Sequence, residues 1–165
     1  MKNILFILAS VVFSNCYAQS DKQTEPFEKV FSVISSEKVF STRFSGIMRQ
    51  LNGVCTLSAA EGDEVIKKGN VVCDKATEVR SFTMPDAGAD TVTMIQSSFF
   101  GLEKCSYMIA ALNKRYGIPE SKNGACEMSW NVKTKRGELP RHVSIEADQK
   151  NNVVYFDLNE DQGSP

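Results

Sequence analysis

The sequence predicts an α+β fold: N-terminal helices with an antiparallel sheet, then a second helix packed on a three- to four-stranded antiparallel sheet. Three observations support this prediction. Apolar residues recur at helical spacing in two places, after residue 26 and before residue 117. Elsewhere apolar and polar residues alternate with a period of two, which is typical of strands that bury one face. Four cysteines follow residue 18, an even number that suits two disulfides in a small exported domain.

Residues 1–18 have the pattern of a cleaved secretory signal. The start is positive, residues 4–13 are apolar but too few to span a bilayer, and small residues precede a cleavage site after Ala18. We therefore expect a flexible lead-in over 19–25 and a periplasmic or secreted protein whose cysteines are oxidised. The alternative is a lipoprotein signal with Cys16 acylated, although the residues before Cys16 match such a site poorly.

Length and charge limit the classes of function. The chain has 165 residues, and removing Lys2 with the signal lowers its 19 basic residues to 18 against 20 acidic ones, a net charge of −2. Proteins that bind nucleic acid or a membrane surface usually carry a clear basic excess, so neither partner is predicted. No later segment is apolar for long enough to insert into a membrane. We expect a single domain over 26–159 and a disordered tail over 160–165.

The first helical region is expected to begin after Thr24, which can cap a helix that has Pro26 in its first turn. Its apolar face changes phase near Ser36 and continues to the turn at Asn52-Gly53. The pattern indicates two helices, or one helix with a kink near Ser36. The residues on these two faces are Phe27, Val30, Phe31 and Ile34, then Phe40, Phe44, Ile47 and Leu51.

Residues 54–100 combine β-prone segments with charged turns, and we expect strands there. A later helix over 102–116 is expected to end at Gly117, with Pro119 just beyond it. Three strands are expected after that helix, over 126–133, 142–148 and 154–159. The halves 26–100 and 101–159 can be laid over each other as two αβββ-like units, so a duplication is left open.

The four cysteines allow three disulfide connectivities. Cys105 lies on the apolar face of the later helix, and Cys126 shares strand parity with buried positions. Cys55 follows the end of the earlier helix and Cys73 follows a charged loop, so local pairing (55 with 73, 105 with 126) is expected. No Cys-x-x-Cys is present, which favours a structural role over a redox role. The spacing does not match a zinc site, and no metal is predicted.

Candidate catalytic residues are few. His142 is the only histidine, and strand parity points it outward beside Ser144 and Glu146 without the turn or the orienting carboxylate of a serine hydrolase. Metal binding by His142 and Glu146 would need ligands that the sequence does not identify. Other carboxylates lie in turns or on a solvated strand face: Glu61, Asp63, Glu64 and Asp157. There is no glycine-rich phosphate loop, so we predict no catalytic residue and no cofactor.

Two surface features indicate a protein partner. Four basic residues surround the turn between two late strands: Lys133, Lys135, Arg136 and Arg141. Such a tip can attract an acidic partner, although turns are also charged for solubility alone. Tyr155 faces outward on the last strand, where tyrosine is either an interface anchor or simply a good strand former.

These observations predict a non-catalytic, exported binding protein, with an immunity protein or inhibitor of a toxin or hydrolase as the first hypothesis. The second hypothesis is an accessory factor in the assembly of the envelope or a secretion apparatus. The third is a secreted enzyme whose site the sequence does not disclose.

Overall fold

The computed structural model describes residues 26–57, 67–73, 77–83 and 91–161. Within them the chain forms three α-helices, one 3-10 helix and eight strands. The helices are α1 (Pro26–Ile34), η1 (Glu37–Ser41), α2 (Phe44–Gln50) and α3 (Lys104–Tyr116). The strands are β1 (Cys55–Leu57), β2 (Lys67–Cys73), β3 (Thr77–Thr83), β4 (Val92–Phe100), β5 (Ser121–Gly124), β6 (Glu127–Val132), β7 (Arg141–Asp148) and β8 (Val153–Glu160). The expected signal segment, lead-in and Thr24 cap lie outside these residues.

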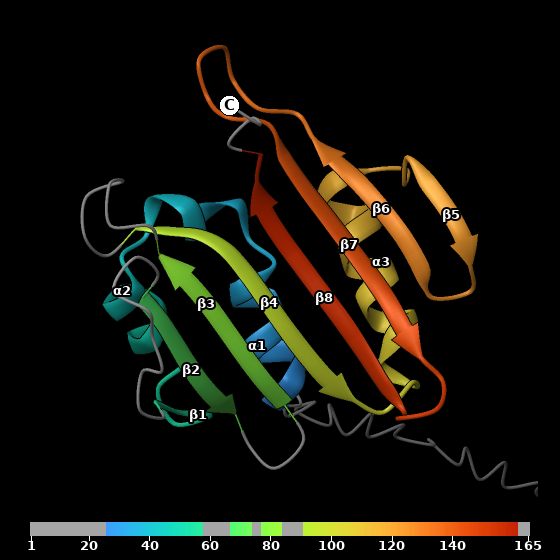
Figure 1. Ribbon diagram of the computed structural model, residues 1–165, viewed down its shortest axis with the longest axis horizontal. Helices are drawn as coiled ribbons and strands as arrows, with labels where there is room; N and C mark the ends of the chain where they lie inside the picture. Colours follow the sequence, from blue (N-terminus) through green and yellow to red (C-terminus); the bar gives the residue numbers. More distant parts are fainter. Residues whose placement is uncertain (1–25, 58–66, 74–76, 84–90, 162–165) are drawn as a thin grey trace, which may run out of the picture.

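All eight strands belong to one antiparallel sheet, in the order β1-β2-β3-β4-β8-β7-β6-β5. The strands of each half run up and down in sequence, and the two sets meet where β4 pairs with β8 (Figure 1). The predicted α+β class with antiparallel sheet is confirmed. The sheet is larger than expected, because β1 and β5 add a fourth strand to each half and the halves share one sheet.

The helices lie together on one face of the sheet (Figure 1). Three apolar side chains of α1 are fully buried: Val30, Phe31 and Ile34. The Phe31 ring meets Phe99 of β4 and Phe156 of β8 edge to face, at centroid distances of 5.7 and 5.2 Å. Aromatic pairs prefer this arrangement. The first helix therefore covers the junction between the two halves.

The later helix packs on β6 in the second half. Its buried face includes Met108 and Leu112, as its apolar spacing predicts. The buried Trp130 of β6 donates its indole N–H to the Gly117 carbonyl at 3.1 Å and to Asn113 Oδ1 at 3.2 Å. The helix ends at Tyr116, and the capping residue Gly117 has a φ of 87°, a conformation that favours glycine. Trp130 thus satisfies polar groups at the end of the helix while filling the core.

The N-terminal helical region differs from the expectation. The pattern predicted two helices or one kinked helix, and the chain instead forms three pieces. The phase change at Ser36 is real: its hydroxyl accepts the Lys38 N–H and caps a short 3-10 turn, η1. Thr42 donates its hydroxyl to the Lys38 carbonyl at 2.6 Å and closes that turn. The 3-10 turn buries Val39 and Phe40 against the sheet side of the molecule.

Both disulfides join the cysteines expected from local pairing. Cys55–Cys73 connects β1 to the facing position of β2, and Cys105–Cys126 connects α3 to the residue before β6. The paired cysteines are 18 and 21 residues apart. Loops of this size are worth about 3 kcal/mol each by restricting the unfolded chain.

Two residues of the expected tail, Glu160 and Asp161, belong to the described part of the chain. Glu160 is the last residue of β8, and the Asp161 N–H donates to the Pro140 carbonyl at 2.7 Å. The chain is ordered through this point because the strand pairing with β7 continues to Arg141. No helix among the described residues has both the length and the apolar character needed to cross a membrane.

Candidate functional site

The face of the sheet away from the helices is turned towards the viewer in Figure 1. Strand alternation places polar side chains on this open face, as predicted for the last three long strands. The outward residues of β4, β8, β7 and β6 include Gln96, Ser98, Tyr155, Asp157, His142, Ser144, Glu146, Glu127, Ser129 and Asn131. Two features are candidates for binding a partner: the hairpin between β6 and β7, and a hollow around Tyr155 on this open face.

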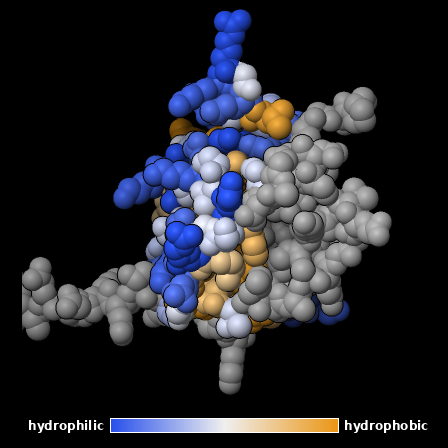
Figure 2. Space-filling view, turned by 90° about the vertical axis from the view of Figure 1, so that its left-hand side faces the viewer, coloured by the Kyte–Doolittle hydropathy of each residue, from blue (hydrophilic) through white to orange (hydrophobic). Residues whose placement is uncertain are grey.

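The β6–β7 hairpin, residues 133–140, rises beyond the end of the sheet (Figure 1). Three of the predicted binding residues, Lys133, Lys135 and Arg136, are exposed in it. In the side view of Figure 2 the same upper end of the molecule finishes in a hydrophilic projection. The turn closes where the Glu138 N–H donates to the Lys135 carbonyl at 3.0 Å. The hairpin therefore presents three cations on a defined turn.

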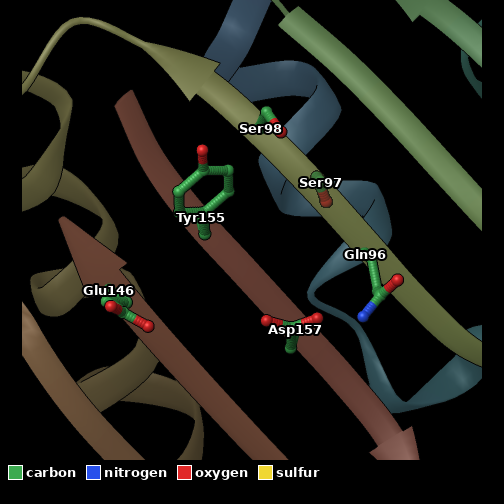
Figure 3. A pocket seen from close by; sticks show the side chains of 6 residues that line it. All are labelled: Gln96, Ser97, Ser98, Glu146, Tyr155 and Asp157. Carbon is green, nitrogen blue, oxygen red and sulfur yellow. The ribbon is translucent and has the colours of Figure 1, made fainter. Parts of the chain in front are cut away.

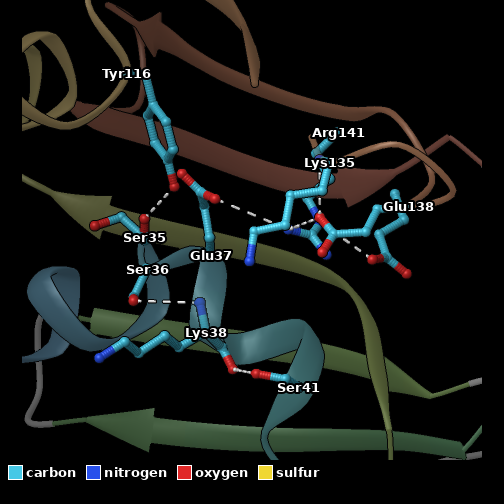
Figure 4. A network of polar contacts seen from close by, with 10 residues as sticks. Ser35, Ser36, Glu37, Lys38, Ser41, Tyr116, Lys135, Glu138 and Arg141 are labelled. Carbon is cyan, nitrogen blue, oxygen red and sulfur yellow. Dashed lines mark hydrogen bonds and ion pairs between the residues drawn. The ribbon is translucent and has the colours of Figure 1, made fainter. Parts of the chain in front are cut away.

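Arg141 does not share that position. It lies in β7, where its side chain is only 13% exposed, and it contacts three carboxylates (Figure 4). Its Nε is 3.1 Å from Glu160 Oε1, while Nη1 is 3.8 Å from Glu138 and 3.9 Å from Glu37. The guanidinium also lies over the Phe40 ring, 4.8 Å from its centroid. The sequence predicted four basic residues at the tip, but only three are exposed there. Arg141 lies below them, and we call it, together with Glu37, Glu138 and Glu160, the arginine clamp.

A second set of polar contacts joins α1 and α3 beside these ion pairs (Figure 4). Tyr116, in the last turn of α3, donates its hydroxyl to the Ser35 carbonyl just after α1. Arg115 donates to the Ser35 hydroxyl and to the Ser32 carbonyl. Burial raises the pKa of Tyr116 to about 12, so this phenol remains a hydrogen-bond donor at neutral pH. The end of one helix therefore supports the end of the other.

The hollow on the open face lies across β4, β8 and β7 (Figure 3). Six residues line it: Gln96, Ser97, Ser98, Glu146, Tyr155 and Asp157. Strand register accounts for the grouping, because Asp157 faces Gln96 on β4 while Tyr155 faces Ser98 on β4 and Glu146 on β7. Directly opposite residues on one face of an antiparallel pair are close enough to interact.

Asp157 is the more buried of the two carboxyls in the hollow. Its side chain is half-buried, and burial raises the pKa of the carboxyl. The nearby Glu146 carboxylate raises that pKa further, whereas a hydrogen bond from Gln96 and the nearby His142 lower it. The sequence predicted a solvated position for Asp157. Asp157 does lie on the open face of the sheet, but it is only partly exposed between its neighbours on β4 and β7.

The other residues considered for catalysis fall into two groups. Glu61, Asp63 and Glu64 lie outside the described residues. His142 faces outward as predicted, with Nδ1 3.4 Å from Asn131 Oδ1. Among the residues that the structure describes, no three His, Cys, Asp or Glu side chains gather closely enough to hold a metal ion.

The predicted binding residues do not form one site. Arg141 pairs with Glu160 at the hairpin end of β8, while Tyr155 lies five residues earlier on that strand. Five residues of strand span ~17 Å. The hairpin and the hollow are therefore separate surfaces, and sequence reasoning missed the hollow because strand parity alone does not give the neighbours of Tyr155. Comparisons of the chain with protein-family models, curated proteins and solved structures found no match.

Proposed function

We propose that this is a non-catalytic, exported binding protein: an immunity protein or inhibitor that occludes a toxin or hydrolase. The observation that carries the proposal is the projecting β6–β7 hairpin, in which Lys133, Lys135 and Arg136 are exposed above the Arg141 clamp. A partner with an acidic cleft fits this tip, since complementary charge speeds encounter and selects the orientation of docking.

The clamp supports the proposal by fixing the base of the hairpin, where Arg141 bonds to Glu160 of β8. Arg141 contacts Glu138 within the hairpin, Glu160 on β8 and Glu37 in the helix layer. A loop that is already held in its bound shape loses less conformational freedom on binding. Leu139, which is 43% exposed on the same hairpin, offers an apolar contact beside the cations. The hairpin therefore offers a partner both charged and apolar surface.

The body of the protein suits the same role. Two disulfides restrict the unfolded chain, and disulfides are typical of proteins in oxidising compartments, in keeping with the predicted export. We also propose that the two helix-and-sheet halves, 26–100 and 101–159, are a duplicated αβββ-like unit extended by one strand each. Such a body would hold the hairpin rigidly.

The test uses the mature chain from residue 19 as bait in an extract of the cell envelope, followed by an activity assay of the purified partner. The proposal expects a stoichiometric partner whose activity falls when the protein is added. The double variant Lys135→Glu/Arg136→Glu should weaken binding by about 10-fold or more, since interface charges of this kind are worth about 1–2 kcal/mol.

The matched control is Lys122→Glu/Lys150→Glu, which makes the same change of charge at exposed positions on β5 and in the β7–β8 turn. Equal losses in the two double variants would show a non-specific charge effect and would contradict the role of the hairpin. Cofractionation with a large membrane complex, without inhibition of any isolated enzyme, would instead favour the second hypothesis of an assembly factor.

A further inference from the structure

We infer that the hollow on the open face of the sheet is a second binding site, and that it receives an arginine side chain of a protein partner. Glu146, Tyr155 and Asp157 are its principal contacts. This inference goes beyond the proposed function, because the hairpin that carries that proposal contributes no residue to the hollow.

The first argument is the arrangement of the groups. In Figure 3 the Gln96 amide nitrogen turns towards Asp157, and the Glu146 carboxylate turns towards the strand that carries Tyr155 and Asp157. Three strands thus direct an amide, an aromatic ring and two carboxylates at one depression. The hollow is therefore lined mainly by polar groups, which suit a polar or charged ligand group.

The second argument is the uncompensated charge. Asp157 is half-buried and Glu146 is near enough to repel it, while Gln96 supplies a neutral donor and His142 offsets only part of the effect on the pKa of Asp157. Among the side chains that the structure describes, which do not include that of Arg80 opposite Gln96, Arg141 forms ion pairs with Glu37, Glu138 and Glu160, and neither carboxylate of the hollow has a Lys or Arg partner. Removing a carboxylate from water without a cation is unfavourable, so a cation that entered the hollow would relieve this repulsion.

The third argument concerns the kind of cation. Tyr155 is 39% exposed, so its ring is accessible to a planar guanidinium that can stack on an aromatic face. Guanidinium also has several donors in a fixed plane and can reach two carboxylates at once, which a point-like ammonium does less well. Arginine is accordingly the side chain that fits all the groups of the hollow.

The test is an NMR titration of the ¹⁵N-labelled mature chain with a short peptide, blocked at both ends, that contains one arginine among neutral residues. The expected result is a localised shift of the Gln96, Glu146, Tyr155 and Asp157 amides and of the Gln96 side-chain amide. The same peptide with citrulline, which keeps the shape but not the charge, should bind at least about 10-fold more weakly, because hydrogen bonds between charged groups are the stronger class.

Two variants locate the effect. Asp157→Asn and Glu146→Gln should each weaken arginine-peptide binding by about 10-fold, whereas Glu120→Gln, an equal change of charge at an exposed residue outside the hollow, should leave it within about 2-fold. The backbone spectrum of each variant shows whether the fold is kept.

Absence of binding to the wild-type chain, equal binding of the citrulline peptide, or equal losses in all three variants would each overturn the inference. The hairpin variant Lys135→Glu/Arg136→Glu should retain arginine-peptide binding, which separates this site from the proposed function.

Discussion

Replacing Arg141 by Met tests whether the arginine clamp stabilises the protein. Methionine keeps the apolar stem of the side chain but removes the guanidinium. Glu160, which is 14% exposed, would then lose its partner at 3.1 Å, while Glu37 and Glu138 would lose a more distant one. The contact with the Phe40 ring would also disappear. We therefore expect a clear loss of stability from one change at the base of the hairpin.

The bond to Glu160 dominates the expected loss. A hydrogen bond to a charged group is worth about 1.5–3 kcal/mol, and both partners here are mostly buried. Glu37 and Glu138 are 43% and 41% exposed, so each of these pairs should contribute less than about 0.5 kcal/mol after solvent screening. The guanidinium–ring contact adds about 0.5–1 kcal/mol. Together these contributions give about 3 kcal/mol, a large part of the roughly 5–15 kcal/mol of a typical domain.

The measurement is urea denaturation followed by the fluorescence of Trp130, the only tryptophan in the chain. A loss of about 3 kcal/mol lowers the urea midpoint by about 1–3 M at the usual slope. A double-mutant cycle with Glu160→Gln should give a coupling of about 2 kcal/mol, whereas Lys135→Met should change stability by less than about 0.5 kcal/mol. A loss below about 1 kcal/mol for Arg141→Met, or no coupling to Glu160, would refute the clamp as described.

Three further results are expected. Asp157→Asn should stabilise the protein at pH 7. Because the pKa of Asp157 is raised in the folded state, its protonated form stabilises the wild type below the unfolded pKa, and that stability is lost as pH rises through the folded pKa. The gain from Asn, measured by urea titration, should therefore vanish near pH 3.5, where Asp157 is protonated in both states. Replacing Cys105 and Cys126 together by Ala should cost about 3 kcal/mol in the same assay without reductant. Ser144→Lys, directly opposite Asp157, should add about 0.2–1 kcal/mol and weaken the arginine peptide in the NMR titration.

The alternation of apolar and polar residues was sufficient to predict the long strands of the second half and the side chains that they bury. Trp130, Ile145 and Phe156 are buried and Tyr155 is outside, as their parity predicts. The pattern fails where a strand has little apolar content: β5 is Ser-Lys-Asn-Gly and β1 has three residues, and both are recognisable only by their pairing. Short, polar edge strands are common in native sheets because they discourage pairing with another chain.

The hairpin with its arginine clamp and the hollow around Tyr155 could not be predicted in full, because alternation along one strand does not show which strands are its neighbours. Arg141 turned out to be a clamp because Glu160, expected in the tail, is its register partner on β8. Asp157 is half-buried because β8 pairs with β4 of the other half. Both pairings join residues far apart in the chain, and only the assembled sheet brings them together. Sequence alone therefore located the exposed cations and Tyr155, but not their surroundings.

Two carboxylates of β8, those of Glu160 and Asp157, have opposite surroundings. Glu160 is mostly buried and has an arginine at 3.1 Å, whereas Asp157, three residues earlier, has an amide donor, a second carboxylate and His142 nearby but no arginine bonded to it. A basic residue opposite Asp157 would compensate its charge, yet the chain has Ser144 there. Charge left unbalanced in a hollow costs stability, and such costs concentrate at functional sites. The contrast argues that Asp157 is kept for a cation that comes from outside the chain.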